Sequence, residues 1–162
     1  MSDRGLFRGY ALNAIDAKGR VAIPAPFRKI VESNSEEAVI VIATHDADPC
    51  LSGYDRDWAD LLRTDLRANE ARERDAGRDF NTHTSNRRAF TLTEDVGFDA
   101  SGRFIMPRFF LGKAQLAEWV LFLGTGDQFE MWNPHILIGA PSVDEDTKDL
   151  ARYLLAERGV AC

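Results

Sequence analysis

The chain has 162 residues, of which 44% are hydrophobic and 28% are charged, and its formal net charge is −6. This composition is typical of a globular protein and excludes a membrane span, which needs roughly 18 consecutive apolar residues. The acidic balance also excludes a protein that coats nucleic acid indiscriminately, so nucleic-acid binding would depend on locally basic segments. Residues 1–5 lack the apolar core of a signal peptide, and we expect the chain to be cytoplasmic.

The first predicted elements are two strands joined by a tight turn. Residues 7–15 form the first strand, residues 17–19 the turn, and residues 21–23 a short strand that ends at a proline. A helix is predicted over residues 24–30, because proline is tolerated in a first helical turn. Residues 39–43 form an apolar run that is long enough for a buried strand and too short for a helix.

A second helix is predicted to begin near Asp55, because Asp55 and Asp57 suit the positive end of a helix dipole. The apolar residues that follow at helical spacing are Trp58, Leu61, Leu62 and Leu66. Residues 69–88 are crowded with charge and form either a solvated helix or a mobile connector. Residues 55–90 hold eight arginines and eight acidic residues, a balance that favours surface ion pairs over DNA binding.

The last third of the chain repeats the strand pattern and ends in a helix. Residues 104–106, 120–123 and 129–132 are predicted strands. The aromatic side chains assigned to the core are Trp119, Phe122, Phe129 and Trp132. A closing helix is predicted over residues 144–158, where apolar residues recur at helical spacing after three acidic residues.

One segment occurs twice in the chain. Residues 16–28 recur as residues 99–111, an offset of 83 residues, and both copies contain the pattern Asp-x-x-Gly-Arg. Such a repeat indicates one structural unit used twice. We therefore predict two half-sized modules that share a core, since each half alone would be marginally stable.

The repeated pattern places a carboxylate four residues before a guanidinium across a tight turn. Asp16 and Asp99 are predicted to shape their loops by capping turn amides, and Gly19 and Gly102 to supply a backbone conformation that other residues resist. The first copy lies in a basic part of the chain, since residues 1–30 hold six basic and two acidic residues.

Two roles are open for the arginine of each pattern. Arg20 and Arg103 either pair only with the aspartate of their own loop or contact DNA. Lys18 and the flanking Arg8 and Arg28 favour DNA contact for the first copy, because they would form a basic tip suited to phosphates and to bidentate reading of guanine. The second copy has serine and leucine in place of Lys18 and Arg28 and is the weaker candidate.

Catalysis and metal binding have no strong candidate centre. His45 lies near Asp46 and Asp48, but a zinc site would require four ligands with a recognisable spacing. The chain has no Gly-x-x-x-x-Gly-Lys-Ser/Thr phosphate loop, no Gly-x-Ser-x-Gly elbow and no Cys-x-x-Cys pair. We predict a protein that is not an enzyme and that binds no metal, cofactor or small-molecule substrate.

Four segments carry a resemblance to a known family. They are Leu6-Phe7-Arg8-Gly9, residues 15–24 with Phe27-Arg28, Asp99-x-x-Gly102-Arg103-x-Ile105-x-Pro107, and Gly124-x-Gly126-Asp127-x-Phe129-Glu130-x-Trp132. Over residues 6–133 the chain resembles the bacterial MraZ family. It departs from the family pattern between the two copies, in the hairpin at residues 45–49, and at Ser101.

The resemblance implies a mainly β fold with helices, of the α+β class. Two tandem swapped-hairpin modules of the AbrB type, at residues 6–54 and 91–133, are expected to form a pseudo-dimeric β-barrel. A helical connector over residues 55–90 and a C-terminal helix over residues 141–160 complete the predicted organisation. Protomers of the family assemble into rings, for which an octamer is one candidate.

The resemblance also implies a nucleoid-associated, sequence-specific DNA-binding transcriptional regulator. It is expected to bind direct repeats of double-stranded DNA in the promoter of its own gene and to repress that promoter with the division and cell-wall gene cluster. Arg20 is the first candidate for a DNA contact, followed by Lys18, Arg8 and Arg28, with Arg103 in second rank. Linked modules on spaced sites would gain affinity without new contacts.

Two alternatives keep the same fold. One is an AbrB-type antitoxin that binds a protein toxin and its operator, although such antitoxins normally have one short module with a disordered tail. The other is a ring protein without a DNA function, which would not need Lys18 or Arg20.

Overall fold

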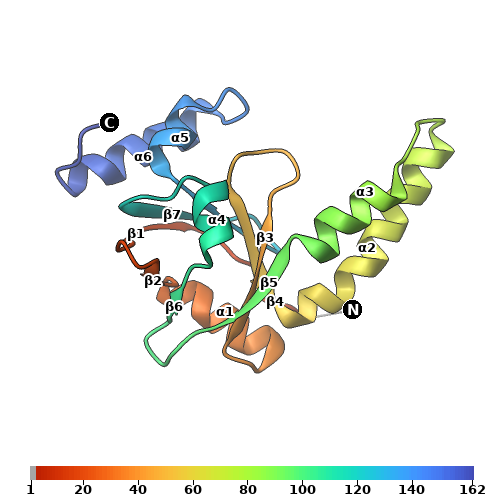
Figure 1. Ribbon diagram of the computed structural model, residues 1–162, viewed down its shortest axis with the longest axis horizontal. Helices are drawn as coiled ribbons and strands as arrows, with labels where there is room; N and C mark the ends of the chain where they lie inside the picture. Colours follow the sequence, from red (N-terminus) through yellow and green to blue (C-terminus); the bar gives the residue numbers. More distant parts are fainter. Residues whose placement is uncertain (1–2) are drawn as a thin grey trace.

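The computed structural model describes residues 3–162, which form a mixed α+β fold with antiparallel sheets (Figure 1). The strands are β1 (Tyr10–Ala14), β2 (Arg20–Ala22), β3 (Val39–Thr44), β4 (Leu51–Asp55), β5 (Thr93–Gly97), β6 (Arg103–Ile105), β7 (Trp119–Gly124) and β8 (Phe129–Trp132). Six of them form one sheet in the order β1-β7-β8-β4-β3-β5, and β2 pairs with β6 in a separate two-stranded ribbon. The predicted α+β class is confirmed.

Helices surround these strands. They are α1 (Ala25–Ser35), α2 (Arg56–Asp75), α3 (Thr82–Asn86), the π-helical η1 (Arg87–Thr91), α4 (Arg108–Lys113), α5 (Pro134–Gly139) and α6 (Glu145–Glu157). Asp55 caps α2, because its Oδ1 accepts a hydrogen bond from the Trp58 N–H at 2.8 Å. Asp144 caps α6 by accepting from the Thr147 N–H at 2.9 Å. Both helices begin where the sequence predicts.

Two segments differ in their helix boundaries from the prediction. One follows the predicted second helix, and the other precedes the closing helix. Of the two alternatives for residues 69–88, helix is correct for the continuation of α2 to Asp75 and for α3. The C-terminal helix is shorter than residues 141–160, and the unpredicted α5 precedes it. Asn133 and Pro134 explain α5, because an asparagine cap followed by proline is a favourable helix start.

The two halves of the chain exchange their first strands. β1 pairs with β7 of the second half, and the equivalent β5 pairs with β3 of the first half. The equivalent strands β4 and β8 pair with each other, as do β2 and β6. Each half therefore supplies one strand that hydrogen-bonds to the hairpin of the other half, β1 to the β7–β8 hairpin and β5 to the β3–β4 hairpin.

Both faces of the central strands are buried. On β3, Ile40 and Ile42 enter the main core, whereas Val41 and Ala43 face the opposite way and pack beneath Trp58 of α2. On the other side of the molecule, α5 and α6 cover the outer face of β7 and β8. This double burial explains why these strands read as continuous apolar runs rather than as alternating ones.

The main core lies between the large sheet, the ribbon, α1 and α4. Phe7, Phe27, Phe122 and Phe129 form its centre, with ring centroids of neighbouring pairs 5.0–6.4 Å apart. Edge-to-face and tilted contacts of this kind add to the stabilisation from burial. The ribbon packs on this core through Val21 and Phe104. The core thus fixes the position of the two loops that precede β2 and β6.

Candidate nucleic-acid interface

The first loop, residues 16–20, is held by one carboxylate. Asp16 Oδ1 accepts hydrogen bonds from the backbone N–H groups of Lys18 at 3.0 Å and Arg20 at 2.9 Å, and its Oδ2 accepts from Arg20 Nε at 2.6 Å. The Gly19 N–H donates to the Asp16 carbonyl at 2.9 Å. Asp16 therefore shapes the loop and also aims the arginine that follows it.

The second loop, residues 99–103, repeats this geometry. Asp99 Oδ1 accepts from the N–H groups of Ser101 and Arg103, both at 2.9 Å, and Asp99 Oδ2 accepts from Arg103 Nε at 2.9 Å. The Gly102 N–H donates to the Asp99 carbonyl at 2.9 Å. The predicted loop-shaping role of both aspartates fits this arrangement, and the serine leaves the loop geometry unchanged.

Each loop glycine lies against the other half of the chain. Gly19 has φ +84°, and a β-carbon there would lie 3.0 Å from the Met106 carbonyl oxygen. Gly102 has φ +81°, and its β-carbon would lie 3.0 Å from the Ile23 carbonyl oxygen. Only glycine combines this backbone angle with such a close approach. Each loop therefore packs closely against the backbone that follows the opposite strand of the ribbon.

The ribbon brings the two motif arginines together. Arg20 lies opposite Ile105, and Arg103 lies opposite Ala22. Opposite residues of an antiparallel pair share one face, and diagonal neighbours are about 7–8 Å apart. Arg20 and Arg103 are therefore diagonal neighbours on the outer face of the ribbon, while Val21 is buried on the inner face.

Both arginines are free to reach a ligand. Their side chains are 61% exposed at Arg20 and 71% exposed at Arg103. In each, Nε donates to the loop aspartate, and no hydrogen bond within residues 3–162 uses the Nη1 or Nη2 groups. Pairing with the aspartate and contact with a ligand are thus compatible, and the two roles left open by the sequence are not exclusive.

The loop aspartates stay ionised because their partners favour the charged form. Hydrogen bonding from the Arg20 backbone N–H, followed by its guanidinium, holds the pKa of Asp16 below its usual value. The backbone N–H of Arg103 is the largest cause of the lowered pKa of Asp99. The arginine positions are therefore held by charge-assisted bonds at neutral pH.

Two of the predicted basic residues lie elsewhere than expected. Arg28 does not flank the first loop, because its Nη1 lies 3.2 Å from the β-carbon position of Gly102 in the second loop. Arg8 follows Phe7, whose N–H donates to the Gly126 carbonyl at 2.7 Å, at the far end of β1 from the first loop. Arg28 therefore lies beside the second loop, and DNA contact by Arg8 stays a prediction.

The exchange of strands and helices accounts for the position of Arg28. Each half contributes its first helix to cover the loop of the other half, so Arg28 of α1 reaches the second loop and Leu111 of α4 reaches Gly19. Each loop consequently has two neighbouring cations, Lys18 with Arg20 and Arg28 with Arg103. The second loop is more basic than its own sequence indicates.

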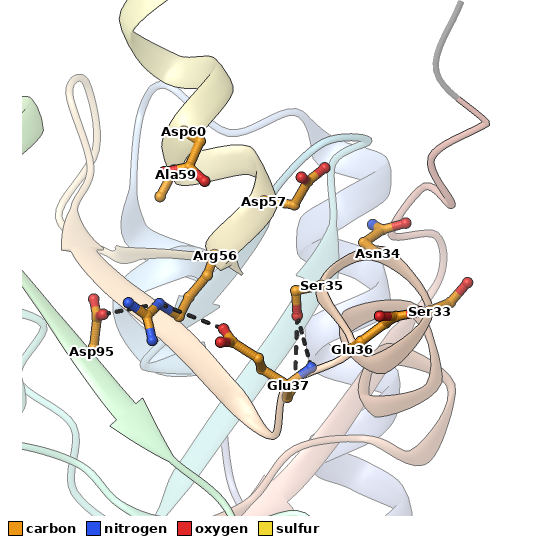
Figure 2. A pocket seen from close by; sticks show the side chains of 10 residues that line it. All are labelled: Ser33, Asn34, Ser35, Glu36, Glu37, Arg56, Asp57, Ala59, Asp60 and Asp95. Carbon is orange, nitrogen blue, oxygen red and sulfur yellow. Dashed lines mark hydrogen bonds and ion pairs between the residues drawn. The ribbon is translucent and has the colours of Figure 1, made fainter.

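A polar cleft of about 630 Å³ lies at the end of α1 and the start of α2 (Figure 2). Arg56 crosses it with its Nε 3.6 Å from Glu37 Oε2 and 3.4 Å from Asp95 Oδ2. Five of its ten lining residues are acidic, and neither motif loop contributes to it. An acidic cleft repels phosphates, so it is no candidate for nucleic-acid binding.

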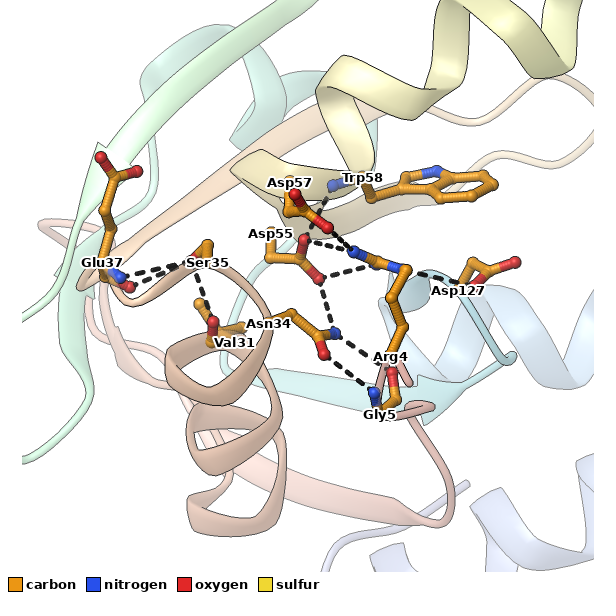
Figure 3. A network of polar contacts seen from close by, with 10 residues as sticks. All are labelled: Arg4, Gly5, Val31, Asn34, Ser35, Glu37, Asp55, Asp57, Trp58 and Asp127. Carbon is orange, nitrogen blue, oxygen red and sulfur yellow. Dashed lines mark hydrogen bonds and ion pairs between the residues drawn. The ribbon is translucent and has the colours of Figure 1, made fainter. Parts of the chain in front are cut away.

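Arg4 belongs to the basic N-terminal segment, but its guanidinium is paired with carboxylates of the folded protein. Its Nη1 and Nη2 donate to Asp55 at 3.2 and 3.0 Å, and Nη1 donates to Asp57 at 2.7 Å (Figure 3). The guanidinium also lies over the Trp58 ring, 5.5 Å from its centroid. With its side chain only 8% exposed, Arg4 pins the N-terminal arm to α2.

His45, Cys50 and Glu130 form a cluster whose potential metal-ligand atoms lie within 4.8 Å of one another. His45 Nδ1 accepts the N–H groups of Ala47 at 3.1 Å and Asp48 at 3.0 Å, so the ring proton is on Nε2, 2.9 Å from Glu130 Oε2. A metal at Nε2 would have to displace that proton while Nδ1 stayed unprotonated. Burial also raises the pKa of the Cys50 thiol. These contacts favour a structural role, in which His45 ties the loop between β3 and β4 to Glu130 on β8.

The matched proteins extend over most of the chain. The family described as "MraZ protein, putative antitoxin-like" matches residues 6–79. A transcriptional regulator MraZ of Rhodospirillum rubrum is 32% identical over 138 residues, which cover 81% of this chain and 81% of the relative. One of Pseudomonas fluorescens is 34% identical, covering 79% and 80%, and one of Syntrophobacter fumaroxidans is 28% identical, covering 95% and 97%.

Within the described residues 3–162, every helix is too short or too polar to span a membrane. The relatives above 30% identity align with about four fifths of this chain and of their own length. The chain belongs to the MraZ family.

Proposed function

We propose that this protein is a sequence-specific DNA-binding transcriptional regulator that reads DNA with the outer face of the β2–β6 ribbon. The observation that carries the proposal is the diagonal pairing of Arg20 and Arg103, each exposed and each aimed by its own aspartate. The names of the matched relatives, all transcriptional regulators, support the same assignment.

The geometry of the ribbon suits the major groove. B-DNA has a major groove about 12 Å wide, which admits a two-stranded β-ribbon. Arginine reads guanine by donating two hydrogen bonds to O6 and N7. Because Nε of Arg20 is already bound to Asp16, the two terminal Nη groups are left to make this bidentate contact. Lys18 and Arg28 would neutralise phosphates on either side.

For the fold, we propose that the two halves are AbrB-like modules, at residues 6–54 and 91–133, in one pseudo-dimeric β-barrel. The exchange of β1 and β5 between the halves supports this, because two equivalent units complete each other. Residues 55–90 connect them, and α5 with α6 seals the outer face of the second half.

Avidity would overcome the net charge of −6. We propose that protomers assemble into a ring that presents several ribbons to direct repeats in the promoter of its own gene, and that binding there represses that promoter and the division and cell-wall cluster. Linked sites raise the effective concentration, so overall affinity exceeds that of one contact. Association with the nucleoid would follow from DNA binding.

Fluorescence anisotropy with the DNA upstream of its own coding sequence tests this function. The protein should bind that fragment at least about tenfold tighter than a shuffled fragment of equal composition, and a duplex with two repeats tighter than one. Equal affinity for both fragments at every salt concentration would reject sequence-specific regulation.

The antitoxin-like description of the matched family supports a second candidate, a protein that binds a toxin as well as its operator. In this chain α5 and α6 pack into the second apolar cluster rather than forming a free tail. Co-expression with the product of an adjacent gene, followed by affinity purification of the complex, would favour the antitoxin. An oligomer that binds neither DNA nor a protein would favour a structural ring.

A further inference from the structure

Ile105 is an exposed apolar residue on the proposed reading face. It is 61% exposed, although the neighbouring Phe104 and Met106 are buried. It lies directly opposite Arg20 and two residues from Arg103 in its own strand. The side chain therefore shares the outer face with both motif arginines. Its side chain is not part of the main core, and its backbone pairs with Arg20 in the ribbon.

Ile105 also breaks the symmetry of the ribbon. The equivalent position in the first copy is Ala22, which lies opposite Arg103. The two arginines are related by the repeat, but one has isoleucine opposite it and the other has alanine. A face with this asymmetry presents a direction to DNA, which suits direct repeats better than a palindrome.

We infer that Ile105 reads thymine by contact with the C5-methyl group in the major groove, beside the guanine contacted by Arg20. This inference rests on the proposed function. The thymine methyl is the apolar group that the major groove displays, and apolar side chains recognise it by direct contact. Residues directly opposite in an antiparallel pair lie about 4.5–5.5 Å apart, so the two side chains would reach adjacent base pairs.

A deoxyuridine scan tests the inference. Each thymine of the shortest duplex that the wild-type protein binds is replaced in turn by deoxyuridine, which removes only the C5-methyl group. At one position or more, wild-type affinity should fall about three- to fivefold, which is the loss expected when the burial of one methyl group is removed. Ile105→Ala should bind the unmodified duplex more weakly and show no further loss at that position.

Leu61→Ala is the matched control, because Leu61 is an exposed aliphatic residue on α2, away from the ribbon in Figure 1. It should keep the full wild-type sensitivity to deoxyuridine, and Ile105→Val should keep part of it. Wild-type binding that is insensitive at every thymine, or equal sensitivity in Ile105→Ala, would overturn the reading of thymine while the proposed function stands. Failure of the wild type to bind unmodified DNA would instead reject the proposed function itself.

Discussion

Arg28 lies against Gly102, with its Nη1 3.2 Å from the position that a β-carbon would occupy there. This contact joins the first helix of one half to the loop of the other. Its equivalent, Leu111 against Gly19 at 3.3 Å, is apolar. The pair of contacts shows that the fold redistributes charge between the two copies of the motif.

Replacement of Arg28 by leucine should preserve the fold and weaken DNA binding. Leucine is accommodated at the equivalent position by Leu111, so the packing against Gly102 has a precedent in the same molecule. Loss of one phosphate contact should reduce the salt slope of binding by about 0.9. Anisotropy titrations at several salt concentrations measure this slope. Arg63→Leu on α2 is the control, and a slope reduced equally in both variants would argue against a specific role for Arg28.

Replacement of Gly102 by alanine should destabilise the protein by about 1–3 kcal/mol. The φ of +81° strains an L-residue, and the new β-carbon would lie 3.0 Å from the Ile23 carbonyl oxygen. Urea denaturation measures the change. Gly112→Ala is the matched control, since no atom lies within 4 Å of its β-carbon position and α4 should gain up to about 1 kcal/mol from alanine. Equal stability of the two variants would contradict the role assigned to Gly102.

The conformation of the first loop should change in acid but not at neutral or mildly alkaline pH. The pKa of Asp16 is lower in the folded protein than in the unfolded chain, so its stabilising bonds are fully present above the ordinary carboxyl pKa of about 3.9. They are lost as the pH falls through the lower, folded-state value. The amide chemical shift of Arg20 should therefore stay constant between about pH 5 and 8 and change in acid. Asp16→Asn should abolish that acid transition; a transition that survives would assign it to another group.

Replacement of Asp55 by alanine should cost about 3–5 kcal/mol of stability, because it leaves the buried Arg4 charge without its main partner. It also removes the cap of α2 at the Trp58 N–H. Asp57→Ala should cost less than about 1 kcal/mol, since that carboxylate is 47% exposed. Denaturant titrations of both variants check the difference, and similar losses would mean that burial does not set the strength of this network.

The sequence alone is sufficient to predict the local features of the fold. Asp55 and Asp144 cap their helices because a side chain that accepts a backbone N–H acts within three residues. The loop geometry at Asp16 and Asp99 is equally local. These predictions depend on neighbours in the chain, which the sequence shows directly.

Features that depend on distant pairing could not be predicted from local patterns. The position of Arg28 follows from the pairing of β2 with β6, which lie far apart in sequence and bring Ile23 against Gly102. The same β2–β6 pairing places Arg103 beside Arg20 and makes the second loop a full member of the proposed interface. By contrast, α5 has a local signal in Asn133 and Pro134 that the helical periodicity did not reveal.

Whether Arg20 reads DNA is decided by the affinity of Arg20→Ala for the upstream DNA, compared with that of Arg74→Ala. Arg74 is a close match, being 57% exposed and paired with Glu70 four residues earlier, as Arg20 is 61% exposed and paired with Asp16. We expect Arg20→Ala to lose about 1–3 kcal/mol of binding free energy and its preference over shuffled DNA, while Arg74→Ala binds like the wild type. Wild-type affinity and specificity in a folded Arg20→Ala protein of unchanged oligomeric mass would contradict this expectation.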